Sequence, residues 1–345
     1  TLKRTRAMTR FQYCLSVITA VAFLSSLSTL NLLSLMMRTS KYHTSTLQQT
    51  GMRKLLASSF ADTFIDKHLV RDLMQLSSDI YDVDEKGIPA SDVISDPTKF
   101  ELLLWIEAAF STEVMIVRSR EDHGLPPIIV FRGSEERDDW KANLNIGLEK
   151  SRFENAPDVV ELHRGFQSAV FNENVMGRVE DKVLELVGES GEVVVTGHSL
   201  GGANAHICAV YLADKHPSMK VTMVNFGAPR FGNDEFKSWT EGSLANLSAW
   251  RFVYRSDIVP RIIPTSLGYN HAGHLFAIYR YESEVYYRQT GGGEYEEAPN
   301  GWYYAASIRH HLQRTYVKFF EKNINNSKFW PNDFEKVPPP RKECP

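Results

Sequence analysis

Hydrophobic residues change their spacing several times along the chain, and each change predicts a different element. Apolar residues recur at helical spacing over residues 62–81, and a dense apolar run over residues 100–110 predicts a second helix. Residues 113–119 and 126–131 are short, β-branched runs, which predict buried strands. Helical spacing returns over residues 165–188, so the first half of the chain contains both kinds of element.

The second half of the chain alternates strand patterns with helix patterns. Strands are predicted at residues 192–196, 220–226 and 250–255, a hairpin at residues 274–290, and helices at residues 200–216 and 305–323. Strands that alternate with helices indicate an α/β fold with a mostly parallel central sheet. Hairpin patterns near the ends indicate that this sheet is mixed.

The first forty residues do not fit this α/β pattern. A basic flank precedes an uncharged run over residues 11–37, which predicts a secretory signal peptide or a membrane anchor within residues 1–40. Either one would direct the chain into the secretory route, to be secreted or anchored in a membrane. We expect a linker over residues 41–54, a folded domain over residues 55–330 and a proline-rich tail over residues 331–345.

The composition excludes several classes of function. The 345 residues include 39 basic and 42 acidic side chains, a net charge of -3, so a nucleic-acid partner is not expected. The 3 cysteines cannot form a disulfide framework or a cysteine-rich zinc site, and we expect no disulfide. No helix carries the histidine pair of a metal hydrolase. The sequence therefore implies no metal, no cofactor and no obligate protein partner.

One segment carries a catalytic pattern. Residues 193–202 read VVVTGHSLGG, a G-x-S-x-G sequence centred on Ser199 that follows a predicted strand and precedes a predicted helix. Such a tight turn presents the serine hydroxyl above the sheet, beside the backbone N–H groups of the following helix. The pattern therefore predicts a nucleophilic serine.

A serine nucleophile needs a base and an acid that orients the base, and in this architecture both follow it in the chain. Asp257 directly follows a predicted strand, whereas its competitor Asp234 stands at a predicted helix start, where an acidic side chain has an ordinary structural role. Four histidines follow Asp257 in the chain: His271, His274, His310 and His311. The residues favour the adjacent pair His310 and His311 as the source of the base, and they leave the choice within the pair open.

Five motifs occur in the order in which one enzyme family carries them. They are FRGS at 131–134, HRGF at 163–166, GHSLGG at 197–202, FGAPRFGN at 226–233 and DIVPR at 257–261. Together they make the chain resemble the class 3, fungal-type lipases of the α/β-hydrolase superfamily, over about residues 60–320. The resemblance implies a central mixed sheet flanked by helices, and a Ser-Asp-His triad.

The resemblance also implies roles for individual residues. It assigns Ser199 as the nucleophile and Asp257 as the acid. His311 is implied as the base because a leucine and then an aromatic residue follow it, and the neighbouring His310 is the alternative. His271 matches a position that is not catalytic in the family.

Two further features come from the resemblance. Ser134 and Leu200 are implied as the oxyanion-hole donors through their backbone N–H groups. Residues 135–142 match the family's lid, in which Trp140 is either a contact to lipid or a packing anchor. Because this stretch is mainly charged, we expect weak activation at a lipid surface, which favours an esterase with a soluble substrate.

The expected function is hydrolysis of carboxylic esters through an acyl-enzyme. Acylglycerols at a lipid–water interface are the expected substrates. A phospholipase and a soluble-ester esterase of the feruloyl type are alternatives. A lipase-like protein that has lost catalysis and acts as a binding partner is a further alternative, although the triad residues are all present.

Overall fold

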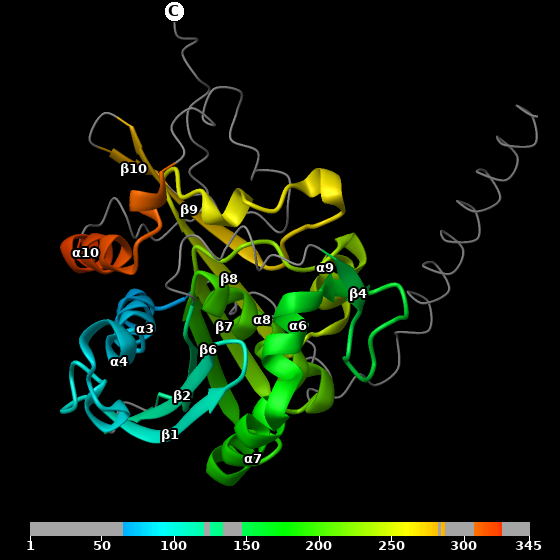
Figure 1. The fold of residues 1–345 in the computed structure, drawn as a ribbon, viewed down its shortest axis with the longest axis horizontal. Helices are drawn as coiled ribbons and strands as arrows, with labels where there is room; N and C mark the ends of the chain where they lie inside the picture. Colours follow the sequence, from blue (N-terminus) through cyan, green and yellow to red (C-terminus); the bar gives the residue numbers. More distant parts are fainter. Residues whose placement is uncertain (1–64, 121–124, 134–146, 282–283, 287–306, 326–345) are drawn as a thin grey trace, which may run out of the picture. The chain divides into compact units, whose positions relative to one another are not determined.

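The central sheet is built mainly from the predicted strand runs (Figure 1). The computed structural model describes residues 65–120, 125–133, 147–281, 284–286 and 307–325. Within these residues the main sheet has the strand order β1-β2-β3-β6-β7-β8-β9-β10. Its strands are β1 Phe100–Ala108, β2 Thr112–Ser119, β3 Ile128–Phe131, β6 Glu192–His198, β7 Lys220–Phe226, β8 Leu247–Tyr254, β9 His274–Tyr281 and β10 Glu284–Tyr286.

Strand direction brings several loops to one edge of this sheet. The neighbours β3, β6, β7, β8 and β9 are parallel, while β1–β2, β2–β3 and β9–β10 pair antiparallel. This is the mixed, mostly parallel sheet that the sequence predicted. Because parallel strands end at the same edge, the loops after β3, β6, β7 and β8 emerge together, which is where α/β folds bind their ligands.

Helices cover both faces of the sheet (Figure 1). α3 and α10 contribute to the hydrophobic cluster on one face, and α6, α7 and α8 to the cluster on the other. Strand β6 contributes to both clusters, because its side chains alternate between the two faces of the sheet. Val194 belongs to the cluster with α3 and α10, and Val193 and Val195 belong to the cluster with α6, α7 and α8. The helices are α3 Lys67–Asp79, α4 Asp82–Lys86, α6 Arg164–Phe171, α7 Val175–Val187, α8 Leu200–Lys215, α9 Asp234–Ser243 and α10 Gln313–Asn323.

Short elements complete the described chain. A separate pair of antiparallel strands, β4 Leu148–Lys150 and β5 Glu161–His163, precedes α6. The remaining elements are 3₁₀ turns: η1 Ala90–Asp92, η2 Asn172–Asn174, η3 Val259–Arg261, η4 Thr265–Leu267 and η6 Ile308–His310.

The helix predicted over residues 100–110 is wrong. This segment forms β1 and pairs with β2 from Phe100 to Ala108, with a register shift between Leu102 and Leu104. A dense apolar run satisfies a strand as well as a helix, and the partner strand that decides between them is a tertiary feature.

Two other predicted helices are interrupted. The helix expected over residues 165–188 is divided by η2, where Glu173 and Asn174 both have positive φ. The helix expected over residues 305–323 consists of η6 and then α10, with Leu312 extended at ψ 132 between them.

Several predictions fall outside the described residues. These are Ser134, Trp140 and the rest of the lid stretch 135–142, and the segments 1–40, 41–54 and 331–345. Among the residues that are described, no helix is long and apolar enough to cross a membrane, and no group of three acidic, histidine or cysteine side chains could hold a metal ion. Cys208 is buried as a free thiol.

Candidate active site

Ser199 occupies a strained turn between β6 and α8. Its backbone has φ 60 and ψ −132, and its side chain is fully buried. An L-residue rarely adopts positive φ, so the surrounding structure must hold it there. The glycines on either side make this possible, because a side chain at Gly197 would collide with Gly201, and one at Gly201 would collide with the backbone of Phe131. The G-x-S-x-G pattern thus forms the tight turn that the sequence predicted.

The Ser199 hydroxyl lies at the positive end of a helix. Ser199 is the N-cap residue of α8, and Leu200 is the first residue of that helix. Among the described residues, the buried Ser199 Oγ has no hydrogen-bond partner. The N-terminus of a helix favours negative charge through its backbone N–H groups. A negative charge that develops next to Oγ would therefore be stabilised here.

Asp257 follows β8 and is completely buried. Its Oδ1 accepts a hydrogen bond from the Val259 N–H at 2.9 Å. Its Oδ2 accepts one from the Tyr316 hydroxyl at 2.7 Å and lies 2.9 Å from His311 Nδ1. Because a buried charge needs such partners, this arrangement holds the carboxylate in one orientation beside the histidine ring.

Gly227 connects this acid–histidine pair to the serine turn. Ser199 N–H donates to the carbonyl of Phe226 at 2.9 Å, and the next residue, Gly227, has φ +63. A Cβ atom at Gly227 would lie 2.6 Å from Asp257 Oδ2 and 3.1 Å from His311 Nδ1. The serine turn and the Asp257–His311 pair are thus both in contact with the short segment that follows β7.

The other candidates named from the sequence lie apart from Asp257 Oδ2. His310 is partly buried on η6, and its ring packs edge-on against Tyr254 at 5.7 Å between centroids. His271 is buried and bonds through Nε2 to the carbonyl of Pro260 at 2.9 Å. Asp234 begins α9, where its Oδ1 accepts from the Asn270 side chain at 2.7 Å.

Burial opposes the protonation of these histidines. It is the main cause that lowers the pKa of His310 and of His274, which lies on β9 and packs on Trp250. It also places the pKa of His271 well below its usual value, with the nearby arginine charges as further causes. All three histidines are therefore expected to be neutral at pH 7.

Tyr316 lies beside Asp257, although in the sequence it is only an aromatic residue within a predicted helix. Its hydroxyl donates to Asp257 Oδ2 and accepts from the Tyr254 N–H at 2.9 Å. Burial first, and the negative charge of Asp257 second, place its pKa well above the usual value for a tyrosine. The hydroxyl therefore stays protonated and continues to donate. A tyrosine on the apolar face of α10 gave no sequence signal for this role.

His198 and Tyr81 were also missed. His198 is the variable residue of the G-x-S-x-G motif, and its ring stacks on His311 with 4.6 Å between centroids and 27° between planes. Its Nδ1 lies 3.1 Å from the Tyr81 hydroxyl, which comes from the end of the helical segment that contains α3. Burial is the main cause that places the pKa of His198 well below its usual value.

The Arg-Gly-Ser turn after β3 lies against the serine turn. A Cβ atom at Gly133 would lie 3.0 Å from the Ser199 Cβ and would collide with the Tyr81 hydroxyl. Arg132, which precedes it, is buried and forms ion pairs with Glu113 and Asp84, both at 2.5 Å. Ser134 itself lies outside the described residues, so its role as an oxyanion-hole donor stays a prediction.

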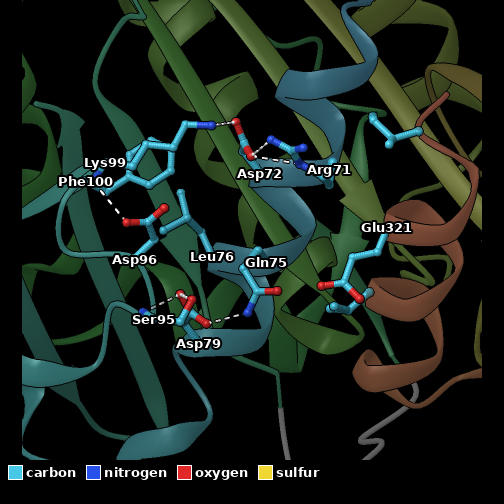
Figure 2. Close-up of a pocket in the computed structure, with 12 residues that line it drawn as sticks. Arg71, Asp72, Gln75, Leu76, Asp79, Ser95, Asp96, Lys99, Phe100 and Glu321 are labelled. Carbon is cyan, nitrogen blue, oxygen red and sulfur yellow. Dashed lines mark hydrogen bonds and ion pairs between the residues drawn. The ribbon is translucent and has the colours of Figure 1, made fainter. Parts of the chain in front are cut away.

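A separate cavity of about 520 Å³ lies between α3, α10 and the segment before β1 (Figure 2). In its wall, the buried Asp79 accepts hydrogen bonds from Gln75 at 2.7 Å and from Ser95, and burial raises the Asp79 pKa. Asp72 pairs with Lys99 and with Arg71. These bonds join α3 to the segment before β1, so the charged wall has a structural role.

The strand order, the serine turn after β6 and the acid after β8 define an α/β-hydrolase fold. Solved structures with this fold include the triacylglyceride lipase of Rhizomucor miehei, with a TM-score of 0.58, 24% identity, and coverage of 71% of this chain and 92% of that chain. A lipase of Rhizopus microsporus var. chinensis gives a TM-score of 0.57 and 22% identity over 71% of this chain and 86% of that chain. These similarities confirm the predicted fold class.

Part of the chain matches the class 3 lipase family. The family model for class 3 lipases matches residues 128–267, which include Ser199 and Asp257. The chain is 28% identical over 219 residues to a lipase of Rhizomucor miehei, which is 60% of this chain and 56% of that protein. It is 31% identical over 149 residues to secreted mono- and diacylglycerol lipase 1 of Fusarium solani, which is 42% of this chain and 41% of that protein.

A plant relative matches a shorter part of the chain. Phospholipase A1-II 5 of Oryza sativa subsp. indica is 32% identical over 130 residues, which is 36% of this chain and 28% of that protein. The chain spans about half of the length of the two fungal relatives, and less of the plant one.

Proposed function

We propose that this chain is a serine hydrolase that cleaves carboxylic esters, with Ser199 as nucleophile, His311 as base and Asp257 as the acid. The observation that carries the proposal is the 2.9 Å contact between His311 Nδ1 and the buried Asp257, next to a strained serine at a helix N-terminus. His311 is preferred to His310 because the ring of His310 packs on Tyr254 instead.

The contacts support an acyl-enzyme mechanism. An ionised carboxylate only accepts hydrogen bonds, so His311 Nδ1 carries the proton that faces Asp257, and Nε2 is the basic nitrogen. As Ser199 Oγ attacks the ester carbonyl carbon, its proton passes to Nε2. The carbonyl oxygen becomes an oxyanion, for which the N–H groups of Leu200 and Ser134 are the proposed donors.

The tetrahedral intermediate then collapses and releases the alcohol. The alcohol oxygen takes the proton from His311 Nε2, and the acyl group stays on Ser199. Water attacks the acyl-enzyme next, giving one proton to Nε2, and a second collapse releases the acid and restores Ser199. Asp257 keeps its charge throughout, because its part is to orient the ring and to stabilise the imidazolium.

Acylglycerols are the proposed substrates. The names of the fungal relatives, a lipase and a mono- and diacylglycerol lipase, support this choice. Phospholipids are a second candidate, because the Oryza sativa relative is named a phospholipase A1. A lid over residues 135–142 with Trp140 stays a prediction, and so does weak activation at a lipid–water interface.

The test is hydrolysis of an ester series from acetate to oleate, measured below and above the solubility limit of each ester. Monoacylglycerol, triacylglycerol and phosphatidylcholine of one acyl chain length would separate the two substrate candidates. We expect acylglycerol turnover that Ser199→Ala and His311→Ala abolish, whereas His310→Ala retains most of it. A wild-type protein that hydrolyses none of these esters would overturn the proposal and favour the binding-protein alternative.

We also infer that residues 11–37 direct the chain into the secretory route. The support is the basic flank and uncharged run in the sequence, together with the word "secreted" in the name of the Fusarium solani relative. Expression in a eukaryotic host with residues 1–40 present should give protein in the medium or in the membrane fraction. Retention in the cytosol would contradict this.

A further inference from the structure

His198 lies between Tyr81 and His311, and it contacts both through different ring nitrogens. Its Nε2 lies 2.6 Å from the backbone carbonyl oxygen of His311. Its Nδ1 lies 3.1 Å from the Tyr81 hydroxyl. His198 and Tyr81 are both buried, so neither contact competes with bulk water.

The chemistry of these partners fixes the proton on His198. A carbonyl oxygen can only accept a hydrogen bond, so His198 Nε2 must carry a hydrogen and donate it to His311. In a neutral ring Nδ1 is then an acceptor, and the Tyr81 hydroxyl donates to it. Burial lowers the pKa of His198, which keeps the ring neutral at pH 7. The hydrogen bonds therefore run in one direction, from Tyr81 through His198 to the His311 carbonyl.

His198 contacts the backbone of His311 at a point that lies between two helical elements. His311 caps η6, and α10 begins only at Gln313, after the extended residue Leu312. The His311 side chain is held by Asp257, and its main-chain carbonyl is held by His198. The histidine is thus fixed at two points, by a residue that follows β8 and by the last residue of β6.

The neutral state of His198 also matters for the ring contact. The two imidazole rings are stacked with 4.6 Å between centroids. In the proposed mechanism His311 becomes positively charged when it takes the Ser199 proton. A neutral ring next to it avoids repulsion between two positive charges at short distance.

We propose that His198, oriented by Tyr81, is a positioning residue that holds the backbone and ring of His311 in place to receive the proton of Ser199. This inference rests on the proposed function, since it assigns His311 as the base. It adds two residues to the machinery that touch neither the substrate nor the reacting atoms.

Two substitutions separate the two contacts of His198. His198→Phe keeps an aromatic ring against His311 but removes the donor to its carbonyl, whereas His198→Gln keeps an N–H group near the Nε2 position and removes the ring. We expect His198→Phe to lower kcat on a soluble short-chain ester about 100-fold, because small displacements of a catalytic group have effects of that size. KM should stay within about twofold, since binding contacts are untouched. His198→Gln should recover kcat to within about tenfold of the wild type.

His206→Phe is the matched control for a buried histidine. His206 lies on α8, is fully buried and packs edge-on against Phe231 and Phe236. His206→Phe should change the thermal midpoint of unfolding. It should leave kcat within about threefold of the wild type, because substitutions at sites that share no interaction partners act independently. If His198→Phe lowered kcat no more than this control, or if His198→Gln were as impaired as His198→Phe, the proposal would be overturned.

Nitrogen-15 NMR of histidine-labelled protein tests the proton assignment without any turnover. The His198 signals, identified by their loss in His198→Phe, should show a protonated Nε2 and an unprotonated Nδ1 at pH 7. A protonated Nδ1 would contradict the inference. An inactive wild type would overturn the proposed function and this role together, whereas an active wild type with a fully active His198→Phe variant would overturn the role of His198 alone.

Discussion

Removal of the Tyr316 hydroxyl is a sharp test of how the acid is held. The hydroxyl is buried, donates to Asp257 Oδ2 at 2.7 Å and accepts from the Tyr254 N–H at 2.9 Å. Tyr316→Phe therefore removes one hydrogen bond to a charged group, a change of about 1.5–3 kcal/mol, and leaves a backbone N–H without its acceptor, about 1 kcal/mol more. We expect the free energy of unfolding to fall by about 3 kcal/mol in total.

The same substitution should reduce activity. With one donor fewer, Asp257 can rotate away from His311 Nδ1, so kcat on a soluble ester should fall about tenfold while KM changes little. The matched control is Tyr211→Phe, because the Tyr211 hydroxyl also donates to a carboxylate, that of Glu180, at 2.7 Å, but between α7 and α8. This control should lose stability and keep its kcat. Equal kcat values for Tyr316→Phe and wild type would refute the idea that Tyr316 orients the acid.

Stability at alkaline pH gives a second measure of the same contact. The folded-state pKa of Tyr316 is raised well above 10.0, mainly by burial and then by the charge of Asp257. The contribution of Tyr316 to the free energy of unfolding is fully present below pH 10. It is lost as the pH rises further, because the tyrosine ionises at lower pH in the unfolded chain than in the folded protein. In urea unfolding, the wild type should lose about 1 kcal/mol more than Tyr316→Phe between pH 10 and pH 11. Parallel slopes would contradict the raised pKa.

Two further predictions concern stability in acid and the glycine beside Asp257 and His311. Burial lowers the pKa of His206 to about 3 and that of His163 to about 4, so the unfolded chain takes up these protons first. The free energy of unfolding should therefore be about 3 kcal/mol lower at pH 4 than above pH 6.5 for each of these two residues. Urea midpoints that do not change between pH 7.5 and 4.5 would refute this. Gly227→Ala should lower kcat about 100-fold, since the new Cβ would lie 2.6 Å from Asp257 Oδ2. Its control Gly188→Ala has a similar φ of +67 and open space around it, so it should lose stability only.

The sequence predicted most of the fold because its strands are short, β-branched and bounded by turns. The parallel centre of the sheet follows from strands that alternate with helices, and the serine turn from a five-residue pattern in the right context. Residues 100–110 were assigned to a helix because an apolar run does not reveal whether a partner strand exists. That information lies in the pairing of Phe100–Ala108 with Thr112–Ser119.

The candidate site was predictable only where a motif carried it. Ser199 and Asp257 stand in recognisable patterns, but two adjacent histidines could not be distinguished by spacing. His311 contacts Asp257 and His310 packs on Tyr254, and these are tertiary contacts that spacing along the chain does not reveal. Tyr316, His198 and Tyr81 were missed because each reads as an ordinary packed aromatic residue. Their contacts are made between residues 59, 113 and 117 positions apart in the chain.

The central claim is that Ser199 is a nucleophile activated by His311 and Asp257. Its most direct test is reaction with a fluorophosphonate probe, followed by intact-mass and peptide mass spectrometry. We expect one adduct for each chain, located on Ser199, at a rate that falls by orders of magnitude in His311→Ala and little in His310→Ala. Ser199→Ala should show no adduct while it unfolds at the wild-type temperature. An adduct on another residue, or none on a folded wild-type protein, would contradict the account.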